Sequence, residues 1–401
     1  MRPLRNPFGS LPPEVAVLTA VAFSVALGFG IVAPAIPLFA KDFGVTNFAA
    51  GAVISAFALV RFASAPMAGR FVNRFGERLI LATGIGIVGV SSFLAGLSGN
   101  YTQLLVLRGV GGFGSAMFTV SSFALLLRVV SADQRGRAAG TYQTGFLLGA
   151  IAGPAFGGPL TAWSLRAPFF VYAITLLLAG TLATVFLART ALREHEVVAG
   201  TADQPPTSLR SAARSPAYRA AVANNFAVGW AILGVRSSLV PLFVVEGLRL
   251  SPSWTGAGLV LSAVVQGLVL IPAGRLVDTR GRRRFLRAGA GFSLVAGVTL
   301  ALAGSAPLFL AAMALYGTGS ALLGVSSAAV VGDVIAGRGG TPVAAFQMAS
   351  DAGAFLGPLV AGALADSASF EVAFLATAAV SGLAFLTTLV MPETRRKRPA
   401  A

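Results

Sequence analysis

The stretch from Gly140 to Gly158, GTYQTGFLLGAIAGPAFGG, decides how this 401-residue chain folds. It has the order G-(x8)-G-(x3)-G-P-(x2)-G-G, and the positions after Gly140 are Gly149, Gly153, Pro154, Gly157 and Gly158. The end of this order returns 204 positions later in GAFLGPLVAG, which contains Gly357 and Pro358. Small residues four positions apart let two helices pack backbone to backbone in a membrane, and a proline inside a helix bends it. The sequence therefore predicts one bent, closely packed membrane helix in each half.

The composition is typical of an integral membrane protein. Apolar residues make up 56% of the chain, charged residues 11%, and the mean hydropathy is +0.81, whereas soluble domains carry about 25% charged residues. A helix needs about 20 apolar residues to cross a bilayer. We predict an all-α membrane protein with twelve transmembrane helices at 14–40, 47–70, 79–98, 102–128, 137–160, 167–189, 217–245, 253–276, 285–304, 307–333, 342–365 and 370–391.

The net charge of +16 is distributed unevenly between the two sides of these spans. Arginines follow the second, fourth, sixth, eighth and twelfth spans, whereas the opposite loops contain only Lys41, Arg166 and Arg249. Basic residues stay on the cytoplasmic side of a membrane. We therefore expect a multi-pass protein of the cytoplasmic membrane with both termini in the cytoplasm. The charge is a topology signal, so no nucleic-acid partner is expected.

Several kinds of chemistry are not expected from this sequence. It has no cysteine, and its one histidine, His195, lies in a polar segment, so neither thiol chemistry nor a histidine-cluster metal site is predicted. It has no enzyme motif and no phosphate-binding GxxxxGK[ST] pattern, so ATP is not the expected energy source. We expect no enzyme activity and no cofactor. The first apolar run is too long for a signal peptide and is predicted to be an uncleaved helix.

A polar stretch at 191–215 divides the chain, and we expect it to be a cytoplasmic loop between six-helix bundles at 1–190 and 216–401. Residues of the two parts match at a shift of 204 or 205 positions: Pro37 with Pro241, Gln143 with Gln347, Gly69 with Gly274 and Gly76 with Gly281. One shift fits several elements, so an internal duplication is predicted. Duplicated membrane bundles that rock about a central site are typical of secondary transporters.

The segments after the second and eighth spans also match, as GRFVNRFGER from Gly69 and GRLVDTRGRRR from Gly274. Glycine permits a tight turn between helices, and Asp278 could accept hydrogen bonds from the free N–H groups of a helix N-terminus. Arginines nearby could bridge to acids on other helices. We predict a cytoplasmic latch that breaks when the halves rock, formed by Gly69, Asn73, Arg74, Gly76, Gly274, Asp278, Gly281 and Arg282.

These motifs together resemble the major facilitator superfamily, and within it the twelve-span drug:proton antiporters. The resemblance covers nearly the whole chain. The Gly140–Gly158 run matches the antiporter signature, and LGFGIVAPAIP at 27–37 resembles the family's first-helix motif. Arg108, with Gly112 and Gly114, resembles R-x-x-x-G-x-G, which the family associates with proton transfer.

The latch segments resemble the superfamily loop G-x-x-x-D-R-x-G-R-[RK], with one departure. Asn73 stands where the family usually has aspartate. If that aspartate helps to close the cytoplasmic side, the latch of the first half is expected to be weaker, and Asp278 to share more of the work.

Four ionisable residues are predicted to lie inside spans, where a charge costs several kcal/mol: Arg61, Arg108, Arg236 and Asp351. Burial disfavours a charged carboxylate and a nearby arginine favours it, so Asp351 could bind a proton in one state and release it in another. It could instead be a permanent partner of Arg61 or Arg236. Arg61 and Arg236 could bind substrate or merely offset Asp351, and Arg108 could bond backbone carbonyls.

We expect a substrate pocket near the membrane midplane, because transporter sites lie there. The candidate residues are Arg61, Arg236, Gln143, Gln347, Tyr142, Asn225, Trp230 and Gln266. The first hypothesis is proton-coupled efflux of amphipathic drugs or metabolites by a monomer. The second is uniport or symport of an anionic or zwitterionic cargo such as an organic anion or lysolipid, because three arginines face one acid. The third is a membrane sensor that transports nothing.

Overall fold

The computed structural model of the chain describes residues 11–130, 135–189, 208–335 and 340–394, and within these ranges all regular structure is helical. The predicted all-α membrane fold is thus confirmed. Most of the expected inter-domain loop, including His195, lies outside the described residues. Its last residues form the short helix α8 (Leu209–Arg214), whose first turn is capped by the Ser208 side chain.

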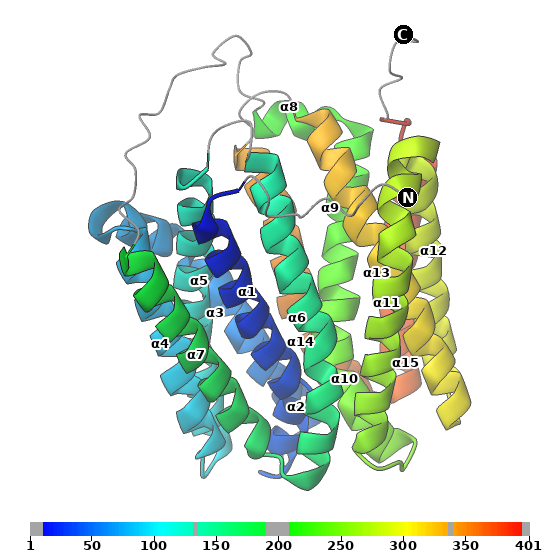
Figure 1. Cartoon of the computed structure of the whole chain (residues 1–401). Helices are drawn as coiled ribbons and strands as arrows, with labels where there is room; N and C mark the ends of the chain where they lie inside the picture. Colours follow the sequence, from blue (N-terminus) through cyan, green and yellow to red (C-terminus); the bar gives the residue numbers. More distant parts are fainter. Residues whose placement is uncertain (1–10, 131–134, 190–207, 336–339, 395–401) are drawn as a thin grey trace, which may run out of the picture. The chain divides into compact units, whose positions relative to one another are not determined.

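The helices divide between two compact units (Figure 1). Unit 1 comprises Met1–Phe43 and Ala56–Ala199, and unit 2 comprises Gly44–Ser55 and Gly200–Ala401. Unit 1 contains α1 (Pro13–Val32), α2 (Ala35–Lys41), most of α3 (Asn47–Phe75), α4 (Glu77–Gly96), α5 (Tyr101–Arg128), α6 (Arg135–Trp163) and α7 (Ala167–Arg189). Unit 2 contains the start of α3, then α8, α9 (Pro216–Val228), η1 (Gly229–Val235), α10 (Arg236–Leu242), η2 (Phe243–Gly247), α11 (Ser253–Arg280), α12 (Arg282–Ala301), α13 (Ala306–Val334), α14 (Gly340–Ser367) and α15 (Phe370–Val390).

Eleven helical segments of the described part are long and apolar enough to cross a membrane. The twelfth predicted span, 285–304, corresponds to α12, which falls short because its first turns carry Arg282, Arg283, Arg284 and Arg287. α12 nevertheless packs against α13 and α15. Arginines at a helix end can extend their charged groups to the membrane interface. α12 therefore completes the expected set of twelve.

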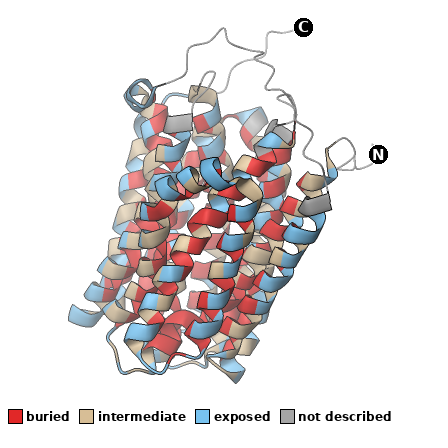
Figure 2. Ribbon diagram, turned by 90° about the vertical axis from the view of Figure 1, so that its left-hand side faces the viewer, coloured by how far each residue is buried: buried red, intermediate tan, exposed pale blue. Residues whose placement is uncertain are grey.

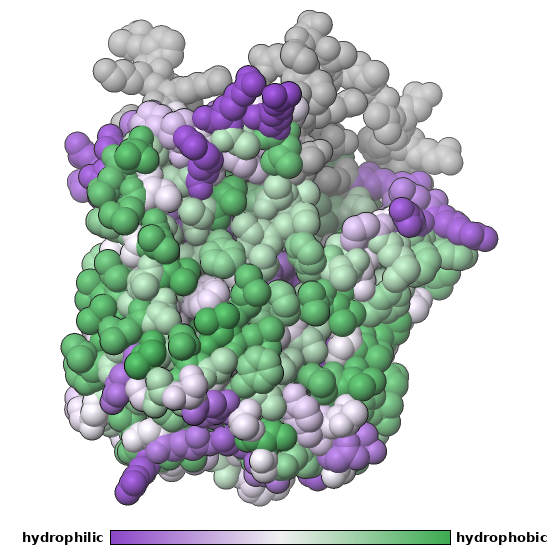
Figure 3. All heavy atoms as spheres, turned by 180° about the vertical axis from the view of Figure 1, so that it is seen from behind, coloured by the Kyte–Doolittle hydropathy of each residue, from purple (hydrophilic) through white to green (hydrophobic). Residues whose placement is uncertain are grey.

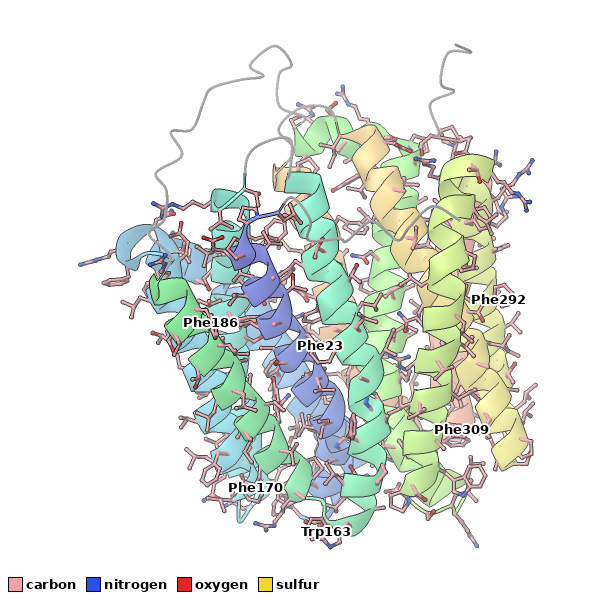
Figure 4. All side chains as sticks on the ribbon, viewed as in Figure 1. Phe23, Trp163, Phe170, Phe186, Phe292 and Phe309 are labelled. Atoms are coloured by element: carbon pink, nitrogen blue, oxygen red, sulfur yellow. The ribbon has the colours of Figure 1, made fainter. Side chains whose placement is uncertain are left out.

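The surface has the polarity that a lipid environment requires. Large apolar side chains such as Leu177, Leu383 and Val390 are exposed on the outer faces of their helices. Figure 3 shows such side chains across the middle of one face, with hydrophilic side chains mainly toward its ends. Trp163 ends α6 and is 81% exposed (Figure 4), a position where aromatic rings anchor a span in the headgroup layer.

Buried residues follow the sides of the helices that face other helices (Figure 2). The largest apolar cluster of unit 2 joins η1 and α10 to α13 and α15 through residues such as Trp230, Phe309 and Phe374. Lipid tails are as apolar as these side chains, so burial alone gives little drive for helices to associate within a bilayer. Close packing of helix backbones must therefore supply most of the free energy that holds the helices together.

Glycines of the quoted stretch supply that close packing in unit 1. A Cβ atom added at Gly153 or Gly157 would lie 2.6 Å from the Leu27 carbonyl oxygen or 2.5 Å from that of Ile31 on α1. Both distances are shorter than carbon and oxygen can approach, so only glycine allows α6 to lie this near α1. Gly158 is buried beside them, and Pro154 lies inside α6 without ending it.

The repeated stretch does the same in unit 2. A Cβ atom added at Gly353 would lie 2.5 Å from the Trp230 amide nitrogen, and one at Gly357 would lie 2.8 Å from the Trp230 carbonyl oxygen. Pro358 lies inside α14 and contacts Gly234 of η1. The fifth and eleventh spans thus pack on the first and seventh spans, respectively, through matching glycines.

A second pair of glycine contacts repeats at a shift of 205 positions. In unit 1, a Cβ atom added to Gly112 of α5 would overlap the Phe57 carbonyl oxygen and lie 3.2 Å from the Arg61 amide nitrogen. In unit 2, Gly317 of α13 has the same relation to Ser262 and Gln266 of α11. The internal duplication therefore extends to individual backbone contacts.

A carboxylate fastens the start of α3 to the end of α14 within unit 2. Asp366 accepts hydrogen bonds from the backbone N–H groups of Asn47 and Phe48, at 2.9 and 2.7 Å. The first N–H groups of a helix lack internal partners and attract a negative charge. Ser55 continues the contact by donating to the Phe355 carbonyl oxygen at 2.8 Å. The first turns of α3 thus belong with α14, whereas the rest of α3 belongs to unit 1.

We expect Gly317→Ala to destabilise the protein by about 1–3 kcal/mol, the usual cost of overpacking. Gly324→Ala is the matched control on the same helix, because nothing lies within 4 Å of an added Cβ atom there. Thermal unfolding of both variants in detergent measures the difference. Equal melting temperatures for the two variants would contradict the close-packing interpretation.

We expect Asp366→Ala to increase hydrogen exchange at the backbone amides of the first turn of α3. The physical reason is the loss of the acceptor for Asn47 and Phe48. Ser367→Ala is the control, because that hydroxyl bonds only within α14. Exchange mass spectrometry of peptides covering 47–51 tests this, and an unchanged exchange rate in Asp366→Ala would show that the carboxylate does not hold the segment.

Candidate functional site

The predicted latch segments are mostly helical, which corrects their description as loops. Gly69, Asn73 and Arg74 lie inside α3, and Gly274 and Asp278 lie inside α11. Nothing in these segments stops a helix before Gly76 and Gly281, where φ is +84° and +108°. Other residues rarely adopt these conformations. Each latch segment is therefore a helix end followed by a one-glycine turn.

The turn at Gly281 is closed by an acid that lies far away in the sequence. Glu393 accepts hydrogen bonds from the N–H groups of Arg282 and Arg283, at 2.8 and 3.1 Å, and so caps α12. A Cβ atom at Gly281 would lie 2.5 Å from the Glu393 carboxylate. The helix-capping role predicted for Asp278 is thus filled at α12 by Glu393, and the Asp278 side chain is outside those the structure describes.

Arg282 also forms an ion pair at this end of unit 2. Its Nε atom lies 2.9 Å from Asp333 Oδ2 at the end of α13, and Thr394 donates to the same oxygen at 2.9 Å. The Arg282 and Asp333 side chains are only 15% and 22% exposed. The pair therefore ties α12 to α13 and, through Thr394, to the segment after α15.

Unit 1 has an ion pair at the equivalent positions with its charges reversed. Glu77 and Arg128 lie 205 positions before Arg282 and Asp333, and Arg128 Nη1 lies 2.9 Å from Glu77 Oε2. This pair is more exposed, since 52% of the Arg128 side chain is accessible. Neither Glu77 nor Arg128 was among the predicted latch residues. Of those in unit 1, Asn73 is exposed and Arg74 lies over the Phe75 ring at 5.3 Å.

We expect Arg282→Gln to lower stability by about 1–3 kcal/mol, because it removes a charge-assisted hydrogen bond to Asp333. Arg284→Gln removes the same charge from an exposed site in the same turn and should have little effect. Chemical or thermal unfolding compares the two. If Arg284→Gln costs as much as Arg282→Gln, the loss reflects net charge and not the ion pair.

Arg108 of α5 is almost completely buried in unit 1, at 2% exposure. Its guanidinium lies over the Phe57 ring at 4.5 Å, and Tyr172 lies near enough to interact with its charge. Its Nε atom is buried without a hydrogen-bond partner. Arg108 forms no ion pair with any residue that the structure describes, so its charge is stabilised by aromatic rings.

Arg236 begins α10 in the middle of the seventh span of the chain, Pro216–Gly247, which belongs to unit 2. Its Nη1 atom donates to the Ser262 hydroxyl at 3.1 Å, and its Nε atom is buried without a partner. It forms no ion pair with any described residue, Asp351 included, which removes one of the two structural partners proposed for Asp351. Asp351 is partly buried near the middle of α14, and Arg61 is partly buried in α3.

Three predicted pocket residues prove to link helices. The Trp230 indole donates to the Thr377 hydroxyl at 3.3 Å, Asn225 donates to the Phe346 carbonyl oxygen at 2.7 Å, and Tyr142 accepts from Ser122 at 3.0 Å. Such bonds are typical of packed membrane helices. Gln143 and Gln347 are exposed and Gln266 is partly exposed. The substrate pocket stays a prediction for all of these residues. No group of three or more metal-binding side chains is found among the described residues.

Sequence reasoning missed several residues that the structure brings forward. Glu393 and Asp366 cap helices, and Ser262 contacts Arg236. A signal for Glu393 was present, because it is an acid directly after the last span beside a basic tail. No local signal singles out Asp366 or Ser262.

Comparison with known proteins identifies the family. The model of the Major Facilitator Superfamily matches residues 18–265 and 226–401. Multidrug resistance protein 2 of Bacillus subtilis is 25% identical over 291 residues, 71% of each chain. Quinolone resistance protein NorA of Staphylococcus aureus is 30% identical over 157 residues, 39% of this chain and 40% of NorA.

Solved structures agree in fold. A bacterial homolog of the human lysosomal transporter Spinster, in an inward-facing and unoccupied conformation, aligns with a TM-score of 0.74 at 15% identity, covering 98% of this chain and all of the other. A POT family transporter bound to a thioalcohol-conjugated peptide aligns with a TM-score of 0.78 at 12% identity, covering 96% of each chain. This chain is a multi-pass membrane transporter that belongs to the Major Facilitator Superfamily.

Proposed function

We propose that the protein exports amphipathic compounds in exchange for protons. The single observation that carries this proposal is Asp351, the one carboxylate near the middle of a span among the described side chains. The names of the relatives, a multidrug resistance protein and a quinolone resistance protein, support efflux. Proton entry can drive such export, because each elementary charge that crosses 100 mV releases about 2.3 kcal/mol.

Asp351 is suited to carry the proton. A carboxylate in a membrane interior is costly when charged and inexpensive when protonated. α14 packs at Gly353 and Gly357 against the seventh span, so Asp351 lies one turn or less from the tightest helix contact of unit 2. A shift of this contact during transport would change the surroundings of the carboxylate, and with them its tendency to hold a proton.

Arg108 is proposed to assist coupling from unit 1. Its charge is buried and lacks an ionic partner among the described residues. The family resemblance of Arg108, Gly112 and Gly114 supports the same role. We further propose that residues 1–190 and 216–401 form two bundles that rock against each other and are joined by residues 191–215. The helix ends with the ion pairs Glu77–Arg128 and Arg282–Asp333 are proposed to lie on the cytoplasmic side. A monomer is proposed to be sufficient for transport.

A second candidate function is transport of an anionic or zwitterionic cargo by uniport or symport. The observation that favours it is the interior charge, because neither Arg108 nor Arg236 is neutralised by a described carboxylate. Both candidates require alternating access, and they differ in whether cargo moves against a proton.

We expect Asp351→Asn to abolish proton-driven accumulation of cargo while leaving the protein folded. The test uses inside-out membrane vesicles with an acidic lumen and two probes, the cation ethidium and the zwitterion decanoylcarnitine. Glu371→Gln is the control, because it removes an exposed carboxylate near the start of α15. Accumulation by Asp351→Asn at the control rate would rule out its coupling role.

A further inference from the structure

We infer that Arg236 binds the carboxylate of the transported compound, so that the cargo class is an amphiphile carrying a carboxylate group. This inference rests on the proposed transport function and adds the chemistry of its substrate. A charged arginine inside a membrane span, such as Arg236, costs several kcal/mol of free energy. The seventh span, Pro216–Gly247, is apolar on both sides of this residue, and a charge at such depth is retained where it has a task.

The protein stabilises Arg236 only in part. Its guanidinium has five N–H donors, and the Ser262 hydroxyl accepts from one nitrogen at 3.1 Å. The Tyr316 hydroxyl lies near enough to interact with the charge. The Nε atom is buried without a partner, and none of the described carboxylates forms an ion pair with it. A positive charge and a directed donor are left for something else to satisfy.

Arg282 of the same unit shows what full pairing of an arginine looks like in this chain. Arg282 has a carboxylate at 2.9 Å and a backbone carbonyl at 3.1 Å. This pairing of an arginine with an acid ties α12 to α13. Arg236 has only neutral oxygen partners, so a purely structural role does not explain why this position carries a charge.

The surroundings of Arg236 are held in place before any ligand arrives. Gly317 brings the backbones of α13 and α11 together at Ser262, and Tyr316 directly precedes Gly317 in α13. Gly229 and Gly234 of η1, the π-helical turns directly before Arg236, pack on the α14 backbone. π-Helical turns are frequent at functional sites. A fixed guanidinium loses little freedom on binding, which favours affinity.

The side chains next to the guanidinium distinguish Arg236 from Arg108. Phe57 and Ser262 occupy equivalent positions at the shift of 205, and each contacts an arginine in the interior of its unit. Arg108 is closed over by the Phe57 ring at 2% exposure, whereas Arg236 is partly exposed and faces the smaller Ser262. Among the described residues, no aromatic ring lies over the Arg236 guanidinium as Phe57 lies over that of Arg108.

The residues around Arg236 select the kind of ligand. One guanidinium matches one negative charge, and its planar pair of donors fits a carboxylate. Val235, Leu239 and Leu259 nearby are apolar and offer no further hydrogen bonds. A small hydrophilic anion would lose its hydration in this apolar interior without replacement, whereas an amphiphile also removes its own apolar part from water.

The test measures binding of two probes that differ only in the carboxylate. Tritiated decanoylcarnitine is a zwitterion with a free carboxylate, and its methyl ester is a cation of the same length. Purified full-length protein should bind the acid about tenfold or more tighter than the ester, as expected for a hydrogen bond to a charged group. Arg236→Gln should remove this preference by weakening the acid only, Arg236→Lys should keep part of it, and Arg284→Gln should keep all of it.

Three results would overturn the inference. These are equal affinity of the native protein for acid and ester, an unchanged preference in Arg236→Gln, and an equal loss of both probes in Arg236→Gln with Arg236→Lys behaving alike. The last result identifies a structural role. Vesicle transport distinguishes failure of the proposed function: proton-driven export without acid preference refutes only this inference, and acid preference without proton-driven export refutes only the coupling.

Discussion

The structure depends on the close approach of helix backbones at a few glycines. Within a bilayer, apolar side chains gain little by leaving lipid for one another, so contact distance decides which helices associate. Gly153 and Gly357 set that distance at equivalent places in the two units, and Gly112 and Gly317 set it at another. Two contact sites per unit fix where Arg108, Arg236 and Asp351 lie in depth, because these residues stand within a few turns of the glycines on the same or adjoining helices.

Charge is used in two ways along these helices. At the ends of spans, Arg282 and Arg128 are paired with acids that tie neighbouring helices together. In the interior, Arg108 and Arg236 rest on a ring or a hydroxyl and form no ion pair with a described residue. An ion pair opposes separation of the helices that it joins. An interior charge without an ionic partner is fully stabilised only when a group of opposite charge binds to it. The same arginine chemistry thus serves structure at the ends and is available for binding in the middle.

Much of this arrangement could be predicted from the sequence because its causes are local or repeated. The twelve apolar segments, the duplicated glycine-proline run and the turns at Gly76 and Gly281 follow from hydropathy, spacing and backbone freedom. Glu393, Asp366 and Ser262 could not be predicted, because their partners lie at least 26 positions away and only packing brings them together. For Trp230 and Asn225 the sequence could not foresee the hydrogen bonds to other helices, because a polar group in a span can link helices or bind a ligand.

The measurement that tests the central claim most directly is cargo-dependent proton movement. Purified protein is placed in liposomes with an acidic lumen and an internal pH-sensitive dye, and decanoylcarnitine or ethidium is then added outside. The account predicts that at least one compound speeds the loss of luminal protons through the protein relative to protein-free liposomes. A proton leak that does not change on addition of either compound, while the protein still binds them, would contradict proton-coupled exchange.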